Sequence, residues 1–499
     1  MADIQIPEEE YRKQLERLGI YDLRQIGREK HVKSPTSLKS GALVNAILDV
    51  EYGRTAPHFS KYGRPPKATV KRADDHSFRG GRKQRAGATD WYRSGSIMSS
   101  GSAVVIPATA ADSGARPSPE GAKEYTGLLE FAPGNGGFGF IRPWKADTFT
   151  GVPDADVYVS AEEVKKYGLK SGDRVRCLAS MGEDSNIPLL CDVISVNDRN
   201  PDEILQRKDF EEIALCAPES RIVLEREGEE NDPAMRLTDL FAPLAKGQRG
   251  LIAAPHGAGA TEYLKSLCRA VTKKKTGMRV FCLLVGARPE EIDAFRRSSG
   301  AVVVASAFDA PFDVTVRTAE MLFDHCKRLA ECGEDVAIFI DSLMGLVRAY
   351  NAVSASQGKT FTTGLDAAAL AGVKHMLAAA RELEAPGSLT VIGTVVENGS
   401  RVENAVAEEL LSTANWAVRL SGEMARRRVF PAMDVAASYA KQETELLSEE
   451  EKRAADEMRR AIADGADESM LSDLVRKTSC NRELLDKYEL WMNGLKENR

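Results

Sequence analysis

Hydrophobic positions change their spacing several times along the chain, and each spacing predicts a different kind of structure. Between residues 8 and 52 apolar residues recur at steps of three and four, which indicates a small helical unit. Between residues 123 and 197 short alternating segments such as YTGLLEFA and ADVYVS are separated by glycine and charged turns. This alternation predicts a small β-barrel of the kind that binds nucleic acids.

The longest part of the chain alternates apolar strands with amphipathic helical stretches. Between residues 203 and 447 the strand candidates include RVFCLLV, DVAIFID and SLTVIGTVV, and VRTAEMLFDHCKRLAECG is one of the helical stretches. This alternation predicts a mostly parallel sheet with helices on both faces, and the charged, periodic tail predicts further helices. We therefore expect a helical unit, a linker, a barrel, an α/β domain and C-terminal helices, at residues 1–53, 54–122, 123–200, 201–447 and 448–499.

Length and composition indicate a folded protein of ordinary globular type. The 499 residues suffice for three or four domains at roughly 100 to 200 residues each. No apolar run reaches the roughly 18 residues of a membrane span, and the N-terminus is charged where a signal peptide is apolar, so a cytoplasmic protein without a membrane partner is expected. The eight cysteines form no CxxC pair and no zinc spacing with histidine, which favours reduced thiols and no transition metal.

The net charge of −6 is unevenly distributed. Residues 54–93 hold eleven lysines and arginines against three aspartates, so this segment carries +8 and the rest of the chain carries −14. Its glycine, proline and serine content predicts a flexible linker. Two interpretations have equal weight: a solvated tether, or an arm that attracts the phosphates of a nucleic acid by releasing counterions.

The barrel segment GFGFIR places two aromatic rings on one strand face. Phe138 and Phe140 are two residues apart, Arg142 follows as a cation for phosphate, and Tyr158 is a further candidate ring. In one interpretation the rings fill the barrel core. In the other they form a platform on which nucleobases stack, at roughly 1 to 3 kcal/mol each.

Several longer segments follow one another in an informative order. GFGFIR, DVYVS, KYGLKSGD and VISVN run through the barrel, and MRLTDLFAPLAKGQRGLIAAP, RPEEI, DSLMGLVRAYN, QGKTFTTGLDAAAL and RRVFPAMD run through the next domain. This order resembles the bacterial transcription termination factor Rho family. The resemblance implies an OB-fold or cold-shock-like RNA-binding barrel and a RecA-like P-loop ATPase domain. It also implies a hexameric ring that grips single-stranded RNA and hydrolyses ATP between subunits to displace RNA polymerase.

The resemblance places the phosphate loop at residues 254–261, APHGAGAT. A P-loop needs a lysine that reaches the phosphates and a hydroxyl that binds Mg²⁺. Thr261 keeps the hydroxyl, whereas Ala260 stands at the lysine position and Gly257 at that of a second lysine typical of Rho. Amides at a helix N-terminus still attract anions, so weak binding of ATP and Mg²⁺ is expected. The implied nucleotide positions are Gly257, Ala258, Gly259, Ala260, Thr261, Glu262, Arg288, Asp341 and Phe430, with Thr261 and Asp341 holding the Mg²⁺ of a bound nucleotide.

The family's catalytic machinery is altered at five positions, which are Ala260, Ala287, Gly345, Gly422 and Lys441. Ala287 replaces the acidic residue that polarises the attacking water, and Lys441 replaces the arginine that reaches the neighbouring subunit's site. Phosphoryl transfer depends on positioning and electrostatics, so we expect hydrolysis to be lost or nearly lost. The alternative is a rearranged active site that another lysine, such as Lys246 or Lys265, reaches.

The resemblance also assigns RNA contacts, at Phe138, Phe140, Arg142, Tyr158, Asp184, Asn186, Lys359 and Arg401. Asn186 stands where Rho usually has a tyrosine, and it can bond a base edge but cannot stack over the base. A weaker or altered pyrimidine preference is therefore expected. Lys359 and Arg401 keep one cation in each predicted pore loop, where they either grip a phosphate backbone or are simply solvated.

Three functions remain open on the sequence. The first is an RNA-binding ring subunit without efficient ATPase, which self-associates or mixes with an active Rho. The second is an active ATP-dependent RNA translocase that terminates transcription. The third is a structural RNA-organising protein in which the basic linker does the binding.

Overall fold

The computed structural model describes residues 39–52, 121–132, 137–143, 156–181, 187–226, 232–273, 277–354 and 367–497, with Arg12, Leu15, Leu23, Ile26, Val32 and Arg54. The chain divides into two compact units, Met1–Arg85 and Ala86–Arg499. Most of the predicted basic linker, residues 55–120, lies outside the described residues.

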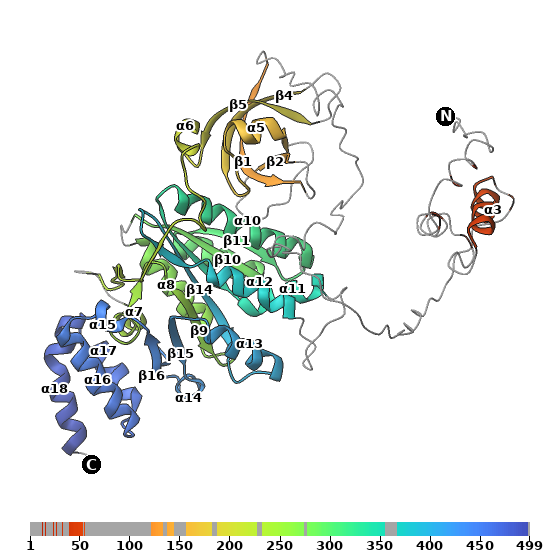
Figure 1. Ribbon diagram of the computed structural model, residues 1–499. Helices are drawn as coiled ribbons and strands as arrows, with labels where there is room; N and C mark the ends of the chain where they lie inside the picture. Colours follow the sequence, from red (N-terminus) through yellow and green to blue (C-terminus); the bar gives the residue numbers. More distant parts are fainter. Residues whose placement is uncertain are drawn as a thin grey trace, which may run out of the picture. The chain divides into compact units, whose positions relative to one another are not determined.

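The first unit contains helix α3 (Ser40–Glu51), drawn in red in Figure 1. One face of this helix is buried, through Leu43, Val44, Ile47 and Leu48. Leu15, Leu23 and Val32 join the same apolar cluster. The steps of three and four residues seen in the sequence are thus the spacing of a buried helical face.

The second unit begins with a closed five-stranded barrel in the order β1-β2-β3-β5-β4. Its strands are β1 (Lys123–Phe131), β2 (Gly139–Pro143), β3 (Val157–Val159), β4 (Arg174–Met181) and β5 (Pro188–Val196). Along β4 alternate residues Val175, Cys177 and Ala179 enter the barrel core, while Arg176 between them faces outward. Helix α5 (Ala161–Lys166) follows β3 and begins at a capping box formed by Ser160 and Glu163. The predicted barrel is confirmed.

A nine-stranded sheet, mostly parallel, forms the centre of the following domain. Its path is β11-β10-β12-β14-β9-β15-β16, with β13 and β6 paired beside it. The strands are β6 (Leu215–Cys216), β9 (Arg249–Ala254), β10 (Arg279–Ala287), β11 (Val302–Ala307), β12 (Asp335–Asp341), β13 (Arg381–Leu383), β14 (Ser388–Val396), β15 (Trp416–Leu420) and β16 (Met433–Ala440). A separate ribbon pairs β7 (Arg221–Ile222) with β8 (Leu244–Ala245). Strands β13, β6 and β16 pair antiparallel, which makes the sheet mixed at these strands.

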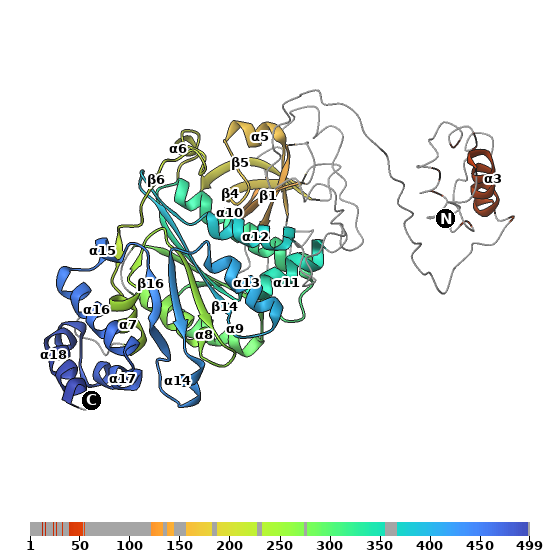
Figure 2. The same ribbon diagram turned by 60° about the horizontal axis from the view of Figure 1, so that its bottom comes forward.

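Helices cover both faces of this sheet, as predicted (Figures 1 and 2). Residues of β10 alternate between two cores, with Cys282 in one and Leu283 in the other. The first core includes residues of α7 (Pro233–Phe241), α8 (Ala260–Lys273), α9 (Pro289–Ser299), α16 (Glu449–Ala463), α17 (Glu468–Lys477) and α18 (Asn481–Glu497). The second includes residues of α10 (Phe312–Glu331), α11 (Leu343–Ser354), α12 (Ala367–Ala378) and α13 (Arg401–Leu411).

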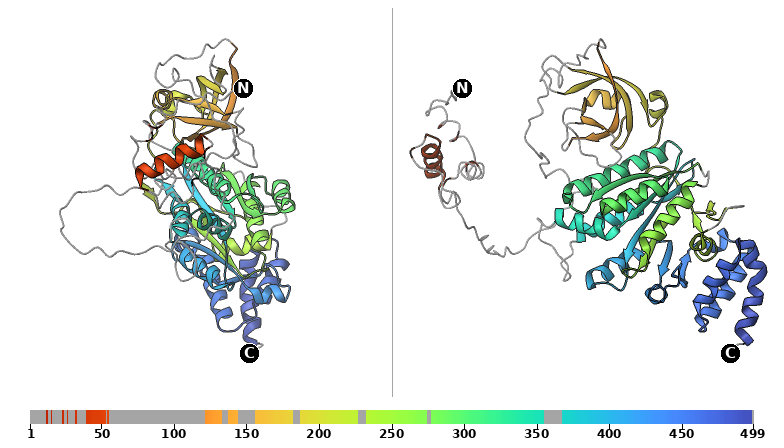
Figure 3. Two further views of the ribbon diagram at one scale, coloured as in Figure 1. Left: turned by 90° about the vertical axis from the view of Figure 1, so that its right-hand side faces the viewer. Right: turned by 180° about the vertical axis from the view of Figure 1, so that it is seen from behind.

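Shorter helices connect these elements, namely α6 (Pro201–Ile204), α14 (Gly422–Arg426) and α15 (Glu443–Leu446). The C-terminal helices pack against α7 at the end of the sheet remote from the barrel (Figure 3). Buried Arg236 on α7 fixes them, because its guanidinium donates to the carbonyls of Val475 and Thr478. The predicted helical tail is therefore part of the α/β domain's core.

A buried ionic cluster joins the barrel to α10. Arg207, after the barrel, donates two hydrogen bonds of 2.5 Å to Asp173, and its Nε lies 3.6 Å from Oε2 of Glu331 on α10. The side chains of Asp173 and Glu331 have no exposed surface. Burial alone would lower the pKa of Arg207, yet the bond to Asp173 and its charge raise that pKa overall. The buried guanidinium of Arg207 therefore keeps its charge next to the two carboxylates.

We expect Arg207→Met to lower the free energy of unfolding by about 3 to 5 kcal/mol, because it leaves buried Asp173 without its charged partner and removes one of the cations around Glu331. Urea denaturation of the full chain measures this loss. Arg176→Met is the matched control, since Arg176 is half exposed in its pair with Glu124 on the same barrel, and it should cause no measurable change. Equal losses in the two variants would contradict a structural role for the buried cluster.

Candidate functional site

Three aromatic rings gather on one side of the barrel. Ring centroids of Phe138 and Phe140 lie 6.1 Å apart, and both lie within 5.9 Å of the Tyr158 ring. Tyr158 is the cross-strand partner of Phe140 and is 5% exposed, while the two phenylalanines are half-buried. The rings pack on Ile187 in a cluster separate from the main barrel core. Phe138 and Phe140 can thus offer ring surface to a base, and Tyr158 supports them from beneath.

Arg142, expected to meet phosphate, is held by two carboxylates. Its Nε lies 2.5 Å from Oε2 of Glu130, and its Nη1 donates to Asp156 at 2.9 Å. Its guanidinium also lies 5.8 Å from the centroid of the Phe140 ring. Burial raises the pKa of Asp156, against the opposing effect of the Arg142 charge. A phosphate must therefore compete with these carboxylates for Arg142.

Glu130 is shared between the barrel and α10. Besides Arg142 it accepts a hydrogen bond of 2.7 Å from Nε of Arg317, and Nη2 of Arg317 bonds its other oxygen. The aromatic surface is thus linked through one carboxylate to the α/β domain. No sequence motif indicates this link, because it depends on the β1–β2 register, which places Glu130 opposite Phe140.

The remaining predicted RNA contacts are only partly described. Arg401 is exposed at the start of α13. Asp184, Asn186 and Lys359 lie outside the described residues. The altered pyrimidine preference and the first pore contact therefore stay predictions.

The predicted phosphate loop connects β9 to α8, as a P-loop requires. Gly257 and Gly259 have φ of 78° and 95°, which side chains with a Cβ rarely adopt. Ala260 is the first residue of α8 and packs against the core beneath the sheet. The turn thus keeps the shape of an anion cradle, while its lysine position holds a methyl group.

The ends of neighbouring parallel strands bring the other predicted nucleotide residues to the same edge. Asp341 ends β12, and its Oδ1 accepts a hydrogen bond of 2.7 Å from Thr394 on β14. Ala287 ends β10 and packs against the same core as Ala260. Arg288, exposed, is the N-cap of α9. Side chains from four distant segments therefore meet at this edge, as expected for the carboxyl ends of parallel strands.

The remaining altered positions lie around this edge. A Cβ at Gly345 would come within 2.9 Å of the carbonyl oxygen of Val285, so a larger residue requires a backbone shift. Lys441 is exposed directly after β16, and Phe430 is 37% exposed after α14. Gly422 begins α14 beside the phosphate loop.

One carboxylate near the loop was not expected from the sequence. Glu403 on α13 is 6% exposed, lies 3.5 Å from Nε2 of His256 and pairs with Arg348 at 2.9 Å. The hydrogen bond from the Ser400 backbone amide, with other contacts, holds the pKa of Glu403 below its usual value. The spacing Ser400-x-x-Glu403 is a capping box and could have indicated its place, although not its contact with the loop.

The part of the chain that the structure describes shows neither a metal-ligating cluster nor a membrane-spanning helix. Within the described ranges, no three side chains of the metal-ligating kinds are brought together. No helix among them combines the length and apolar character needed to cross a membrane.

Comparison with known proteins gives two family matches and many relatives. The Rho termination factor RNA-binding domain matches residues 125–202, and the nucleotide-binding domain of the ATP synthase alpha/beta family matches residues 234–440. Transcription termination factor Rho of Rhodopirellula baltica is 36% identical over 380 residues, which are 74% of this chain and 73% of that protein. The Rho of Streptomyces coelicolor is 40% identical, over 65% of this chain and 76% of that protein. The chain belongs to the Rho transcription termination factor family.

A solved structure gives a weaker likeness. A type III secretion system ATPase of pathogenic bacteria matches with a TM-score of 0.46 and 22% identity, over 56% of this chain and 84% of that chain. The Rho relationship therefore rests on the sequence matches. In this Rho-family chain the barrel is the RNA-binding domain and the sheet domain is of the P-loop nucleotide-binding type.

We expect Glu130→Gln to strengthen RNA binding by this Rho-family barrel about 2- to 10-fold at low salt, because it removes one of the two carboxylate charges that compete with phosphate for Arg142. The plot of log affinity against log salt should steepen by about one unit. Affinity for an oligocytidine, measured by fluorescence anisotropy over a salt series, tests both effects. Glu124→Gln, on the same strand but paired with Arg176, is the control and should leave RNA affinity unchanged. Weaker binding by Glu130→Gln would show that Arg142 does not meet phosphate.

Proposed function

We propose that this protein is a Rho-family subunit that binds single-stranded RNA and whose ATP hydrolysis is impaired or lost. The observation that carries the proposal is the sheet edge at which the nucleotide residues meet. Ala260 and Ala287 stand there at the lysine and carboxylate positions, and both methyl groups pack against the apolar core. A phosphate chain at this edge would meet neither the clamp nor the base that phosphoryl transfer requires.

The two lysines considered as replacements are engaged elsewhere. Lys246 pairs at 2.7 Å with Asp335, the first residue of β12, whereas the nucleotide edge lies at the last residue of that strand. Lys265 pairs at 2.5 Å with Glu262 on its own helix. These contacts favour loss of the phosphate-binding lysine over its replacement by Lys246 or Lys265.

The charge that a neighbouring subunit would supply is also weakened. An arginine finger accelerates phosphoryl transfer by about 10³ to 10⁵, and lysine lacks the planar fork that meets two oxygens. Lys441 stands at that position, exposed at the end of β16. Together with Gly345, where a side chain would press on β10, this supports a defect in several catalytic functions at once.

RNA binding is supported by the match to the Rho RNA-binding domain and by the half-buried Phe138 and Phe140. The basic residues at 54–93 would add phosphate contacts. The subunit would act in a ring, either with copies of itself or mixed with an active Rho, and could thereby regulate termination at RNA polymerase or sequester RNA. ATP and Mg²⁺ would bind weakly, through Thr261 and Asp341.

A second candidate is an active ATP-dependent RNA translocase. Identities of 36% to 40% with named Rho factors favour it, as does Asp341, which is held by Thr394 in position to bind Mg²⁺. Hydrolysis assays separate the two candidates.

We expect the purified protein to show no RNA-stimulated ATP hydrolysis, measured as phosphate release with and without oligocytidine. Ala260→Lys with Ala287→Glu should raise turnover above the background, because the pair restores clamp and base. Adding Asp341→Asn to this variant is the control and should remove the gain. Hydrolysis by the unmodified protein that Asp341→Asn abolishes would favour the translocase.

We also expect this protein to inhibit ATP hydrolysis by an active Rho when the two are mixed. The fractional loss of hydrolysis should exceed the fraction of inert subunits in the mixture. Each inert subunit would disable its own site and the site to which it lends Lys441. Lys441→Arg should relieve the second effect and bring the inhibition closer to proportional. Proportional inhibition by the unmodified protein would indicate that no mixed rings form.

A further inference from the structure

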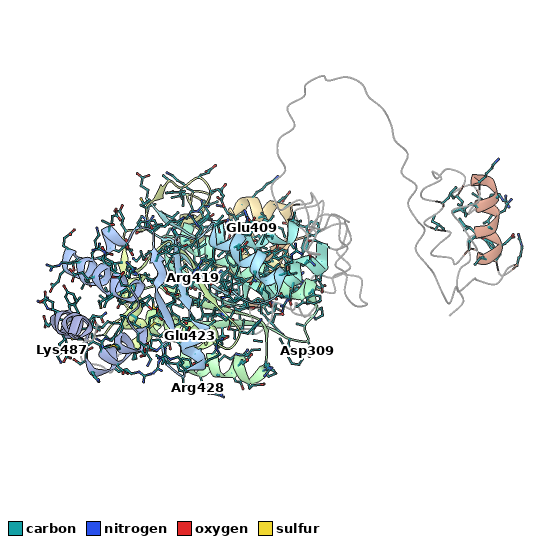
Figure 4. All side chains as sticks on the ribbon, turned by 90° about the horizontal axis from the view of Figure 1, so that it is seen from below. Asp309, Glu409, Arg419, Glu423, Arg428 and Lys487 are labelled. Carbon is teal, nitrogen blue, oxygen red and sulfur yellow. The ribbon has the colours of Figure 1, made fainter. Side chains whose placement is uncertain are left out.

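The phosphate loop has a neighbour that no motif indicates. Strands β9 and β15 are parallel partners, with Ala253 opposite Arg419. The loop therefore leaves the sheet edge beside α14, which begins at Gly422 and ends at Arg426. Figure 4 labels Arg419, Glu423 and Arg428 along this segment.

Gly422 leaves a space that the loop and an arginine share. A Cβ at Gly422 would lie 3.3 Å from Cγ of Pro255, the first loop residue after β9. The same point lies 3.7 Å from Nη1 of Arg426. The guanidinium of Arg426 therefore lies next to the loop. A side chain at residue 422 would begin in the space between the guanidinium and Pro255.

Several other charged side chains near the loop are paired. His256 contacts Glu403 at 3.5 Å, and Arg419 pairs with Glu397 at the same distance. Arg427 pairs with Asp467 at 2.9 Å. Arg426 is exposed, and among the described residues its side chain has no ion pair or hydrogen bond. Its charge is therefore available to an anion at the loop.

We propose that Arg426 supplies a cation to this phosphate loop, and that loop and arginine together bind the phosphate chain of a nucleoside di- or triphosphate. An arginine at residue 422 would stand one turn from Arg426 on the same helix, where two guanidinium groups repel. Glycine at 422 and arginine at 426 therefore form a matched pair, in which one residue supplies the charge and the other gives it room. The guanidinium fork suits phosphate oxygens, and the loop amides complete the cradle.

The inference extends the proposed function, since it takes the degenerate loop as a site that binds nucleotide without turning it over. Binding is measured in the absence of RNA and with ADP, so hydrolysis does not enter the result. ATP hydrolysis by the unmodified protein would overturn the proposed function. The comparison of ADP affinity between the unmodified protein and Arg426→Gln would still hold. Absence of ADP binding would overturn this inference and leave the loss of hydrolysis standing.

The test is titration calorimetry of the full chain with ADP and Mg²⁺ at low salt. Arg426→Gln should weaken ADP binding roughly 10-fold or more, because it removes a charge-assisted hydrogen bond. Arg427→Gln, one residue away and paired with Asp467, is the control and should change the affinity less than about twofold. Gly422→Arg in the Arg426→Gln background should recover most of the affinity, because the charge then returns to the same space.

Two results would overturn the proposal. One is an equal loss of affinity in Arg426→Gln and Arg427→Gln, which would indicate only a general effect of surface charge. The other is no binding of millimolar ADP to the unmodified protein. Thermal melting of each variant excludes unfolding as the cause, and Arg426→Gln should melt with the unmodified protein because Arg426 bonds nothing in the described fold.

Discussion

The second unit depends on two carboxylates buried without any exposed surface. Arg207 lies between Asp173, just before β4, and Glu331 at the end of α10, and contacts both carboxylates. Lys170 contacts the same oxygen of Glu331 as Arg207, and Arg328 contacts the other oxygen. Removing any member leaves a charge that the interior cannot solvate, so the barrel is held to α10 more strictly than apolar packing alone would hold it.

This constraint gives the aromatic side of the barrel its electrostatic surroundings. With β1 fixed against α10, Glu130 lies within reach of both Arg142 and Arg317. The aromatic surface then faces a cation whose charge is already balanced. Binding of a phosphate at Arg142 would return Glu130 to Arg317 alone and so strengthen the contact with α10. The ion pairs of Arg142 would therefore couple a phosphate contact there to the α/β domain.

Sequence patterns predicted what depends on local spacing. Alternation predicted the barrel and the covered sheet, and the order of motifs predicted the family and the nucleotide positions Asp341 and Ala287. The patterns missed what depends on register and on neighbouring strands. Arg142 was expected to meet phosphate, and no pattern indicated that Glu130 and Asp156 pair with it. Arg426 carries no motif, and only the pairing of β9 with β15 brings it to the phosphate loop.

The altered catalytic positions differ in how much the structure would have to change to accept the family's usual side chains again. Ala260 begins a helix, where alanine is the best helix former, and a longer side chain there extends from the helix's first turn at the mouth of the loop. Gly345 is different, because any Cβ meets the carbonyl oxygen of Val285 at 2.9 Å and β10 must move to receive it. Charged residues at a phosphate site cost stability, and selection retains them only for function. If hydrolysis is lost as proposed, the packing of β10 against Gly345 makes that loss harder to reverse than the substitutions at the loop itself.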